Sequence, residues 1–273
     1  MTILSDCHLH SHHSGDSTAS MEDMINRGIS LGLKTMCFTE HNDFDFPGTK
    51  EEPSEIWILN TDSYLYELIR LKEKYADRIE LLFGVELGLQ PECFRKNAVY
   101  ARSYDFDFII GSSHICHGKD PYYPAFFEGR SEKEAYREYF ESILENIKKF
   151  QNFDVYGHLD YVVRYGPHMD RDYSYQDHRE ILDSILTELI EREKGIEINT
   201  SGIAKGMRDF HPCMDIVKRY RELGGELITV GSDAHKPEQI AASFDRISHF
   251  LQECGFRYYC IFEKRTPHFV KLL

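Results

Sequence analysis

The first apolar run of the chain, Ile3-Leu4-Ser5-Asp6-Cys7-His8-Leu9-His10, ends in two histidines that are separated by one residue. Residues two apart on a strand point to the same side, so both imidazoles can converge on one point just past the strand end. The same arrangement recurs near the other end of the chain, in Leu227-Ile228-Thr229-Val230-Gly231-Ser232-Asp233-Ala234-His235. The sequence therefore predicts two strands that carry metal-binding side chains at their carboxyl ends.

Four further apolar runs end in a histidine or a carboxylate. They are Thr39-Glu40-His41, Gly84-Val85-Glu86, Gly111-Ser112-Ser113-His114 and Tyr156-Gly157-His158. A single histidine at a strand end is more often an ordinary surface or hydrogen-bonded residue than a metal ligand. Six such runs together favour a barrel with metal ions at its mouth, because the carboxyl ends of all strands in a parallel barrel meet there.

Short apolar segments without polar alternation are typical of parallel strands that are buried on both faces. Seven strands are expected, at Ile3–Asp6, Thr35–Thr39, Leu81–Leu87, Phe108–His114, Val155–His158, Gly195–Asn199 and Leu227–Ser232. Helical apolar spacing separates them, at Ser20–Leu31, Thr61–Tyr75, Ser131–Lys149, Tyr175–Lys194 and Pro212–Leu223. The alternation predicts an α/β fold, a distorted TIM-like (β/α) barrel. An open doubly wound sheet is the alternative, but it would not bring ligands from six strands together.

Two long segments rich in proline and glycine follow predicted ligands. They are Asp43–Asn60 and His117–Arg130, and both should border the mouth and shape access to it. Aromatic and acidic residues in Tyr122–Glu128 and Glu40–Asp45 are candidates for its rim. Near the end of the chain, Phe256–Phe262 alternates enough to form a short strand.

The bulk composition is that of a folded protein of 273 residues, which we interpret as one domain spanning 1–273. A formal charge of −14 opposes binding to nucleic acid, because like charges repel. No apolar run approaches the roughly 20 residues that span a bilayer, and no signal peptide is expected. Seven cysteines without a C-x-x-C pair favour reduced thiols and a cytoplasmic protein.

The ordered set of motifs resembles that of the polymerase and histidinol phosphatase (PHP) family, from Ile3 to about Lys236. The residues that carry the resemblance are His8, His10, Asp16, His41, Glu86, His114, His158, Asp233 and His235. The resemblance implies a seven-stranded barrel with two to three divalent metal ions, zinc, iron or manganese. One metal would take His8, His10, Glu86 and Asp233. A second would take Glu86, His114 and His158, and a third would take Asp16, His41 and His235.

Asp16 departs from a common family pattern, because many members have histidine at that position. Aspartate is still a competent ligand, and its oxygen makes the third site more favourable for manganese or iron. The neighbouring His12 and His13 are the competing candidates for this role. They could instead be hydrogen-bond donors near the site, or simply exposed.

Two arginines, Arg164 and Arg208, stand in segments that look like the phosphate-binding segments of bacterial histidinol-phosphate phosphatases. Arginine offers a fork of donors that matches phosphate oxygens. Both are therefore predicted to act in substrate binding and catalysis, against the alternative of surface ion pairs. His168 and His211 are further candidates for substrate contact, with Lys205 weaker. Asp233 and His235 are predicted to act in catalysis as well as in metal binding.

The resemblance implies a metal-dependent phosphomonoesterase that hydrolyses L-histidinol phosphate to L-histidinol and phosphate in histidine biosynthesis. Metal ions would activate water for attack on phosphorus. The nearest alternative is another PHP activity, on a nucleotide, a phosphotyrosine or a phosphodiester. An idle metal-binding module is the alternative from a different class. The expected partner is a small phosphorylated substrate, with no nucleic acid and no membrane, and the oligomeric state stays open.

Overall fold

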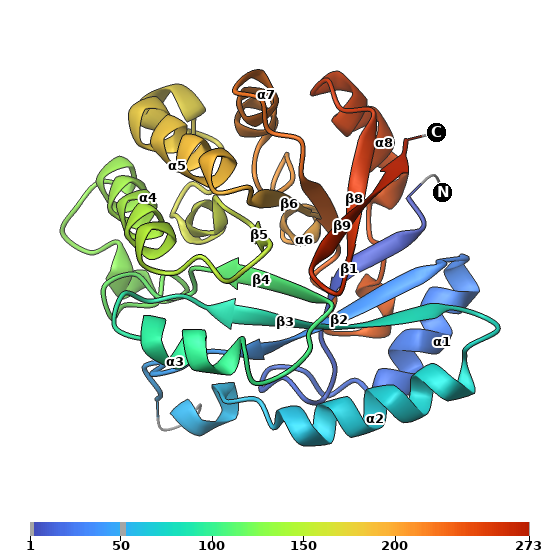
Figure 1. Ribbon diagram of the computed structural model, residues 1–273. Helices are drawn as coiled ribbons and strands as arrows, with labels where there is room; N and C mark the ends of the chain where they lie inside the picture. Colours follow the sequence, from blue (N-terminus) through green and yellow to red (C-terminus); the bar gives the residue numbers. More distant parts are fainter. Residues whose placement is uncertain (1–2, 50–52, 273) are drawn as a thin grey trace.

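Seven parallel strands form one sheet in which neighbours along the chain are also neighbours in space (Figure 1). The computed structural model describes residues 3–49 and 53–272. The strands are β1 (Ser5–Leu9), β2 (Thr35–Asn42), β3 (Glu80–Gly88), β4 (Phe108–Ser112), β5 (Val155–Tyr156), β6 (Gly195–Asn199) and β7 (Ile228–Gly231). All seven predicted strands are present. Their ends differ from the prediction most at β1, which begins two residues later and ends three residues later than expected, and β5 has two residues rather than four.

The sheet closes on itself between β1 and β7. The backbone N–H of His10 donates to the carbonyl of Ala234 at 2.9 Å, and the N–H of Asp233 donates to the carbonyl of His8 at 2.9 Å. These bonds join the two ligand-bearing segments that the sequence pattern singled out. The prediction of a distorted seven-stranded barrel is confirmed, and the open doubly wound alternative is wrong.

Helices surround the barrel (Figure 1). The five predicted helices are found at α1 (Met21–Leu31), α2 (Thr61–Lys74), α4 (Glu132–Lys149), α5 (Arg179–Glu191) and α7 (Met214–Glu222). A capping box starts α4, where Ser131 and Glu134 each bind the other's backbone N–H. The segment predicted as one helix from Tyr175 begins instead as a 3-10 turn, Tyr175–His178, before α5.

The sequence analysis missed several short elements. The helices α3 (Phe94–Tyr100), α6 (Ser201–Ala204) and α8 (Phe244–Glu253) were not predicted. The 3-10 turns are η1 (Ser54–Trp57), η2 (Pro124–Phe126), η3 (Tyr161–Tyr165), η4 (Tyr175–His178) and η5 (Pro237–Gln239). A helix of four to seven residues, such as α3 or α6, has too few turns to show an apolar period, and it forms because tertiary packing stabilises it.

A C-terminal hairpin covers the amino end of the barrel, opposite the mouth. It consists of β8 (Tyr258–Glu263), which the sequence predicted as Phe256–Phe262, and the unpredicted β9 (Thr266–Lys271). Cys260 and Phe262 pack with apolar side chains of β1 to β5. The guanidinium of Arg265 donates to Asp154, just before β5, at 2.6 Å. The hairpin therefore seals this end and leaves the carboxyl end of the barrel for chemistry.

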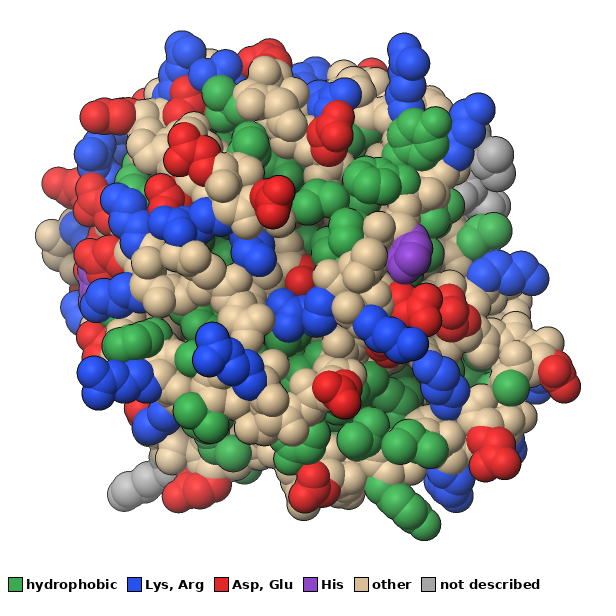
Figure 2. Space-filling view, viewed as in Figure 1, with side chains coloured by type: hydrophobic (Ala, Val, Ile, Leu, Met, Phe, Trp, Pro, Cys, Tyr) green, Lys and Arg blue, Asp and Glu red, His purple; other side chains and the backbone are tan. Residues whose placement is uncertain are grey.

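The loops at the mouth have the extents expected from their composition. The first loop follows β2 and contains the turn η1. Residues 50–52 of this loop lie outside the described part of the chain. The second contains the turn η2. On the face shown in Figure 2, basic and acidic side chains are interspersed. Within the described residues, no helix is long and apolar enough to cross a membrane.

Candidate metal centre

Nine side chains gather at the carboxyl end of the barrel, and they come from six strand ends and one loop. His8, His41 and Glu86 lie on β1, β2 and β3. The others follow a strand directly or stand in the loop after β1. The full set is His8, His10, Asp16, His41, Glu86, His114, His158, Asp233 and His235. The structure brings together every residue that the sequence analysis proposed as a ligand.

The carboxylate of Glu86 lies at the centre of this group and is completely buried. Its Oε2 is 3.1 Å from Nε2 of His8 and 3.0 Å from Nδ1 of His41. Its Oε1 is 3.2 Å from Nε2 of His114 and 2.9 Å from Nε2 of His158. One carboxylate thus faces four imidazoles, which is the arrangement that a residue shared between metal ions requires.

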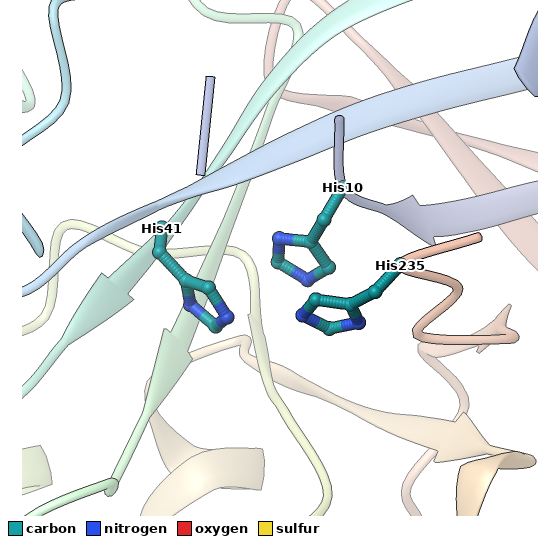
Figure 3. Close-up of side chains that lie close together, drawn as sticks. All are labelled: His10, His41 and His235. Carbon is teal, nitrogen blue, oxygen red and sulfur yellow. The ribbon is translucent and has the colours of Figure 1, made fainter. Parts of the chain in front are cut away.

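Two further carboxylates lie beside this centre. Asp233 has its Oδ1 3.3 Å from Nε2 of His10, and Asp16 has its Oδ2 3.0 Å from Nε2 of His235. The rings of His10, His41 and His235 lie close together in Figure 3. The ring centroid of His10 is 4.1 Å from that of His41 and 4.2 Å from that of His235.

The side-chain atoms that face one another are suited to hold cations. Several of them are buried and have no hydrogen-bond partner among the described residues, and they include Nε2 of His8, His10 and His235, Nδ1 of His41 and Oε2 of Glu86. Buried polar atoms without partners are rare and costly in folded proteins. Imidazole nitrogens and carboxylate oxygens are ligands for zinc, iron and manganese. The residues present therefore fit a multinuclear transition-metal site.

Electrostatics in the cluster lead to the same conclusion. Burial alone would raise the pKa of Glu86, but His8, His114 and His41 hold it well below its usual range. Burial lowers the pKa of His8, yet the carboxylates of Glu197, Glu86 and Asp233 outweigh it and raise the pKa well above the usual value. Without a metal, protons on His8, His41 and His114, whose pKa values are raised, offset the negative charge of the carboxylates. A cation of higher charge would displace those protons.

Three side chains to which the sequence analysis assigned no such role orient the ligands. Glu197 on β6 places Oε1 2.5 Å from Nδ1 of His8, and Asp43 places Oδ1 2.7 Å from Nδ1 of His114. The third, Glu40, accepts hydrogen bonds from the β1–α1 loop. An acceptor at Nδ1 fixes the proton there and leaves Nε2 free to bind a metal. The available signal was an acidic residue inside an apolar strand, as in Ile196-Glu197-Ile198.

Gly231 allows the approach of Glu197 to His8. A Cβ atom at this position would lie 2.5 Å from Oε1 of Glu197 and 2.3 Å from Cβ of His8. No side chain can occupy that space without moving the ion pair. The backbone also departs from ordinary strand geometry at Asp233, where φ is 55°. Uncommon backbone angles of this kind concentrate at functional sites, where the surrounding structure maintains them.

His12 and His13, the competitors of Asp16, turn away from the cluster. Their Nε2 atoms lie 3.4 Å and 2.9 Å from Oε2 of Glu67 on α2. Asp16 instead faces His235 and His41, with its Oδ2 3.6 Å from Nε2 of the latter. The structure thus favours Asp16 over both histidines as the residue that completes the cluster.

A cavity of about 430 Å³ lies directly above the cluster. Asp16, His41, His114, His158, Asp233 and His235 contribute to its floor, and the remaining wall contains aromatic, basic and acidic side chains. Phe46 and Trp57 come from the loop after β2, Asp120 and Tyr122 from the loop after β4, and Tyr161 and Tyr165 from η3. Both loops predicted to border the mouth therefore do so.

Arg164 lines this cavity and is largely buried. Its guanidinium donates to Oγ of Ser201 at 2.9 Å and to the hydroxyl of Tyr165 at 2.9 Å, and it lies over the ring of Tyr161. Its Nε has no partner, and no carboxylate of the described residues forms an ion pair with it. A buried guanidinium without an anion is expected to bind one. Lys205 also lines the cavity.

The other predicted substrate contacts lie elsewhere. The guanidinium of Arg208 is paired with Asp170 and borders a different cavity. His168 is exposed and pairs with Glu132 at 2.7 Å. His211 is completely buried, with its Nδ1 2.5 Å from Oδ1 of Asp160. Glu40, placed at the rim by the sequence analysis, is also completely buried, so that placement is wrong. Arg208, His168 and His211 lie outside the cavity because each is paired with a carboxylate distant in sequence. Glu40 lies outside it because hydroxyl groups of the loop after β1 bind its carboxylate.

Comparisons with known proteins give consistent matches over nearly the whole chain. The family model described as the PHP domain matches residues 6–201. A histidinol-phosphatase of Lactococcus lactis subsp. lactis is 34% identical over 92% of this chain and 91% of its own length. A probable histidinol-phosphatase of Clostridium acetobutylicum is 32% identical over 95% and 97%.

One solved structure has the same architecture throughout. It is a histidinol phosphate phosphatase from Lactococcus lactis subsp. lactis in complex with zinc, L-histidinol and phosphate. It superposes with a TM-score of 0.86 at 31% identity and covers 97% of this chain and 98% of its own.

Proposed function

Because the chain belongs to the PHP domain family, we propose that it is a metal-dependent phosphatase that hydrolyses L-histidinol phosphate to L-histidinol and phosphate. The observation that carries this proposal is the match, over 97% of the chain, to an enzyme solved with zinc, L-histidinol and phosphate. The described geometry agrees with that chemistry, since a cluster of metal-ligand side chains forms the floor of a cavity of substrate size. In this role the protein takes part in histidine biosynthesis.

The nine clustered residues would hold two to three divalent transition metal ions. The central position of Glu86, within 3.2 Å of four imidazole nitrogens, suits a carboxylate that serves two ions. Asp16 adds a hard oxygen ligand beside His235 and His41. Bound divalent ions supply a water nucleophile at neutral pH and neutralise phosphate oxygens.

Arg164 would bind the phosphate group at the cavity wall. Hydrogen bonds to Ser201 and Tyr165 and the face of Tyr161 hold the guanidinium in place, while its buried Nε stays available. A preorganised donor of this kind stabilises the charge that develops on phosphate oxygens in the transition state. Lys205 adds positive charge at the same cavity. Arg208 can contribute only if its guanidinium exchanges Asp170 for the substrate.

The remainder of the cavity suits the other end of histidinol phosphate, which carries an amine and an imidazole. The stacked rings of Phe46 and Trp57, 4.4 Å apart, form one wall. Tyr122 packs edge-to-face on Tyr165 at 5.5 Å and forms another. Aromatic faces attract cationic and aromatic groups. The carboxylate of Asp120 adds a negative charge for the amine.

We also place the protein in the cytoplasm. The seven cysteines, all within the described part of the chain, are free, and six of them are buried. Free thiols of this kind are typical of a reducing compartment.

The test is release of inorganic phosphate from L-histidinol phosphate by protein whose metal content is measured in the same sample. Hydrolysis that disappears with chelator and returns with zinc, manganese or iron supports the proposal. A nucleoside monophosphate, a phosphotyrosine peptide and a phosphodiester complete the panel. A better rate with any of them would replace the named substrate while leaving the metal centre intact.

A further inference from the structure

The carboxylate of Glu40 is buried beneath the loop that carries His10 and Asp16. It lies on β2 next to the ligand His41 and is completely buried. No basic side chain of the described residues forms an ion pair with it. Its oxygens accept hydrogen bonds from the backbone N–H of Ser11 at 3.1 and 3.0 Å, from Oγ of Ser11 at 2.6 Å and from Oγ of Ser14 at 2.5 Å. A buried carboxylate without a cation is costly, so this one calls for a specific explanation.

The hydroxyl of Ser14 connects Glu40 to His10. A hydroxyl has one proton to donate and two lone pairs that accept. The Ser14 proton goes to Glu40, whose Oε2 accepts it at 2.5 Å. One lone pair accepts from the backbone N–H of His41 at 3.0 Å. The other faces Nδ1 of His10 at 3.1 Å, so that this Nδ1 must carry a proton.

A proton at Nδ1 leaves the lone pair of His10 on Nε2. That atom is buried, has no hydrogen-bond partner in the part of the chain that the structure describes, and faces Asp233 at 3.3 Å and Glu86 at 3.5 Å. We propose that Glu40 is a positioning residue that acts through Ser14 to hold His10 in the tautomer that binds metal. The inference rests on the metal-dependent function proposed above, and it assigns a role to a residue that touches neither metal nor substrate.

Ser14→Ala tests the relay because it removes the hydroxyl that connects Glu40 to His10. Nδ1 of His10 then has no acceptor there, and the carboxylates of Asp233 and Glu86 draw the imidazole proton to Nε2, where it blocks metal binding. Glu40→Ala removes the acceptor of the Ser14 proton, so the hydroxyl can donate to Nδ1 of His10 with the same result. The double variant should be no worse than either single one.

The direct readout is the tautomer of His10 in enzyme labelled with ¹⁵N-histidine, from long-range ¹H–¹⁵N correlations with and without zinc. The relay predicts Nδ1–H in the wild type and Nε2–H in metal-free Ser14→Ala and Glu40→Ala. Zinc affinity, measured by competition with a chelator, should fall about 10- to 100-fold in both variants.

The matched control is Asp107→Ala. Asp107 is a buried carboxylate at the opposite end of the barrel, where it accepts from the backbone N–H of Phe83 at 2.9 Å and of Lys264 at 3.1 Å. This variant should lose stability and keep its zinc affinity. An unchanged His10 tautomer in Ser14→Ala and Glu40→Ala, or a loss of zinc affinity no larger than in the control, would overturn the relay. Failure to hydrolyse histidinol phosphate would instead reject the proposed substrate, because the tautomer and zinc readouts need no substrate.

Discussion

Glu197 and His8 are 189 positions apart in the chain, yet Oε1 of Glu197 lies 2.5 Å from Nδ1 of His8. The other oxygen, Oε2, accepts from the backbone N–H of His158 at 3.0 Å and from the amide of Asn199 at 3.2 Å. The carboxylate thus connects His8, on β1, with the backbone of His158, which follows β5. It fixes the proton of His8 on Nδ1 and directs Nε2 at Glu86.

Glu197→Gln should weaken zinc binding about 10- to 100-fold with little change in fold. The two donors at Oε2 require the amide oxygen there, so the amide nitrogen would face His8 and oppose its Nδ1–H. Competition with a chromophoric chelator measures the affinity. Asp154→Asn, at the other end of the barrel, should leave zinc affinity unchanged. Equal affinities in wild type and Glu197→Gln would contradict the assigned role.

Glu86→Gln should remove more metal than any other single substitution, because one carboxylate faces four imidazoles. Elemental analysis of wild-type protein purified without chelator should give more than one transition metal per chain, and this variant should lose at least one of them. Asp16→Ala should lose only the metal beside His41 and His235. Unchanged metal content and rate in Asp16→Ala would show that Asp16 is not a metal ligand.

Arg164→Ala should lower kcat/KM for histidinol phosphate about 30- to 1000-fold, or about 2–4 kcal/mol of transition-state stabilisation. Arg164→Lys should recover only part of this loss, because lysine keeps the positive charge but lacks the planar, two-pronged set of donors of the guanidinium. Metal content should stay at the wild-type value. Arg219→Ala, which removes an arginine paired with Asp183 far from the cavity, serves as the control. Rates for Arg164→Ala within a few-fold of this control would show that the guanidinium does not bind phosphate.

The same assay decides the role of Arg208. In the geometry described, its guanidinium is held by Asp170 outside the cavity. Arg208→Ala should therefore behave like the Arg219 control. A loss as large as that of Arg164→Ala would mean that the side chain leaves Asp170 and reaches the phosphate in the complex.

Zinc loading should release protons. Burial lowers the pKa of His114, but Asp43 and Glu86 outweigh it and raise the pKa to about 10. The pKa of His8 is likewise raised well above its usual value. Both side chains are therefore protonated at pH 7–8 in the metal-free cluster, and zinc must displace those protons. Calorimetry in two buffers of different ionisation enthalpy should show proton release on binding. Affinity should rise with pH between 6 and 8, and a pH-independent affinity without proton release would contradict the predicted charge state.

The strand ends were predictable because a ligand at the end of each apolar run is a local signal, as in His8-Leu9-His10. The placement of Glu197, Asp43 and Glu40 was not predictable from local pattern, because their partners are distant in sequence or lie in a loop whose path depends on the closed barrel. Arg164 and Arg208 look alike in sequence. Only the fold shows that, among the described residues, no carboxylate forms an ion pair with Arg164, whereas Arg208 is paired with Asp170.

The central claim is tested most directly by the ratio of kcat/KM for L-histidinol phosphate to kcat/KM for para-nitrophenyl phosphate, measured with one metal-loaded preparation. Contacts with the amine and imidazole can align the ester as well as bind it, so L-histidinol phosphate should have the higher kcat as well as the lower KM. The account predicts a ratio of at least about 100, which corresponds to about 3 kcal/mol. A ratio near one, or a higher kcat/KM for a nucleotide or phosphotyrosine peptide, would contradict it.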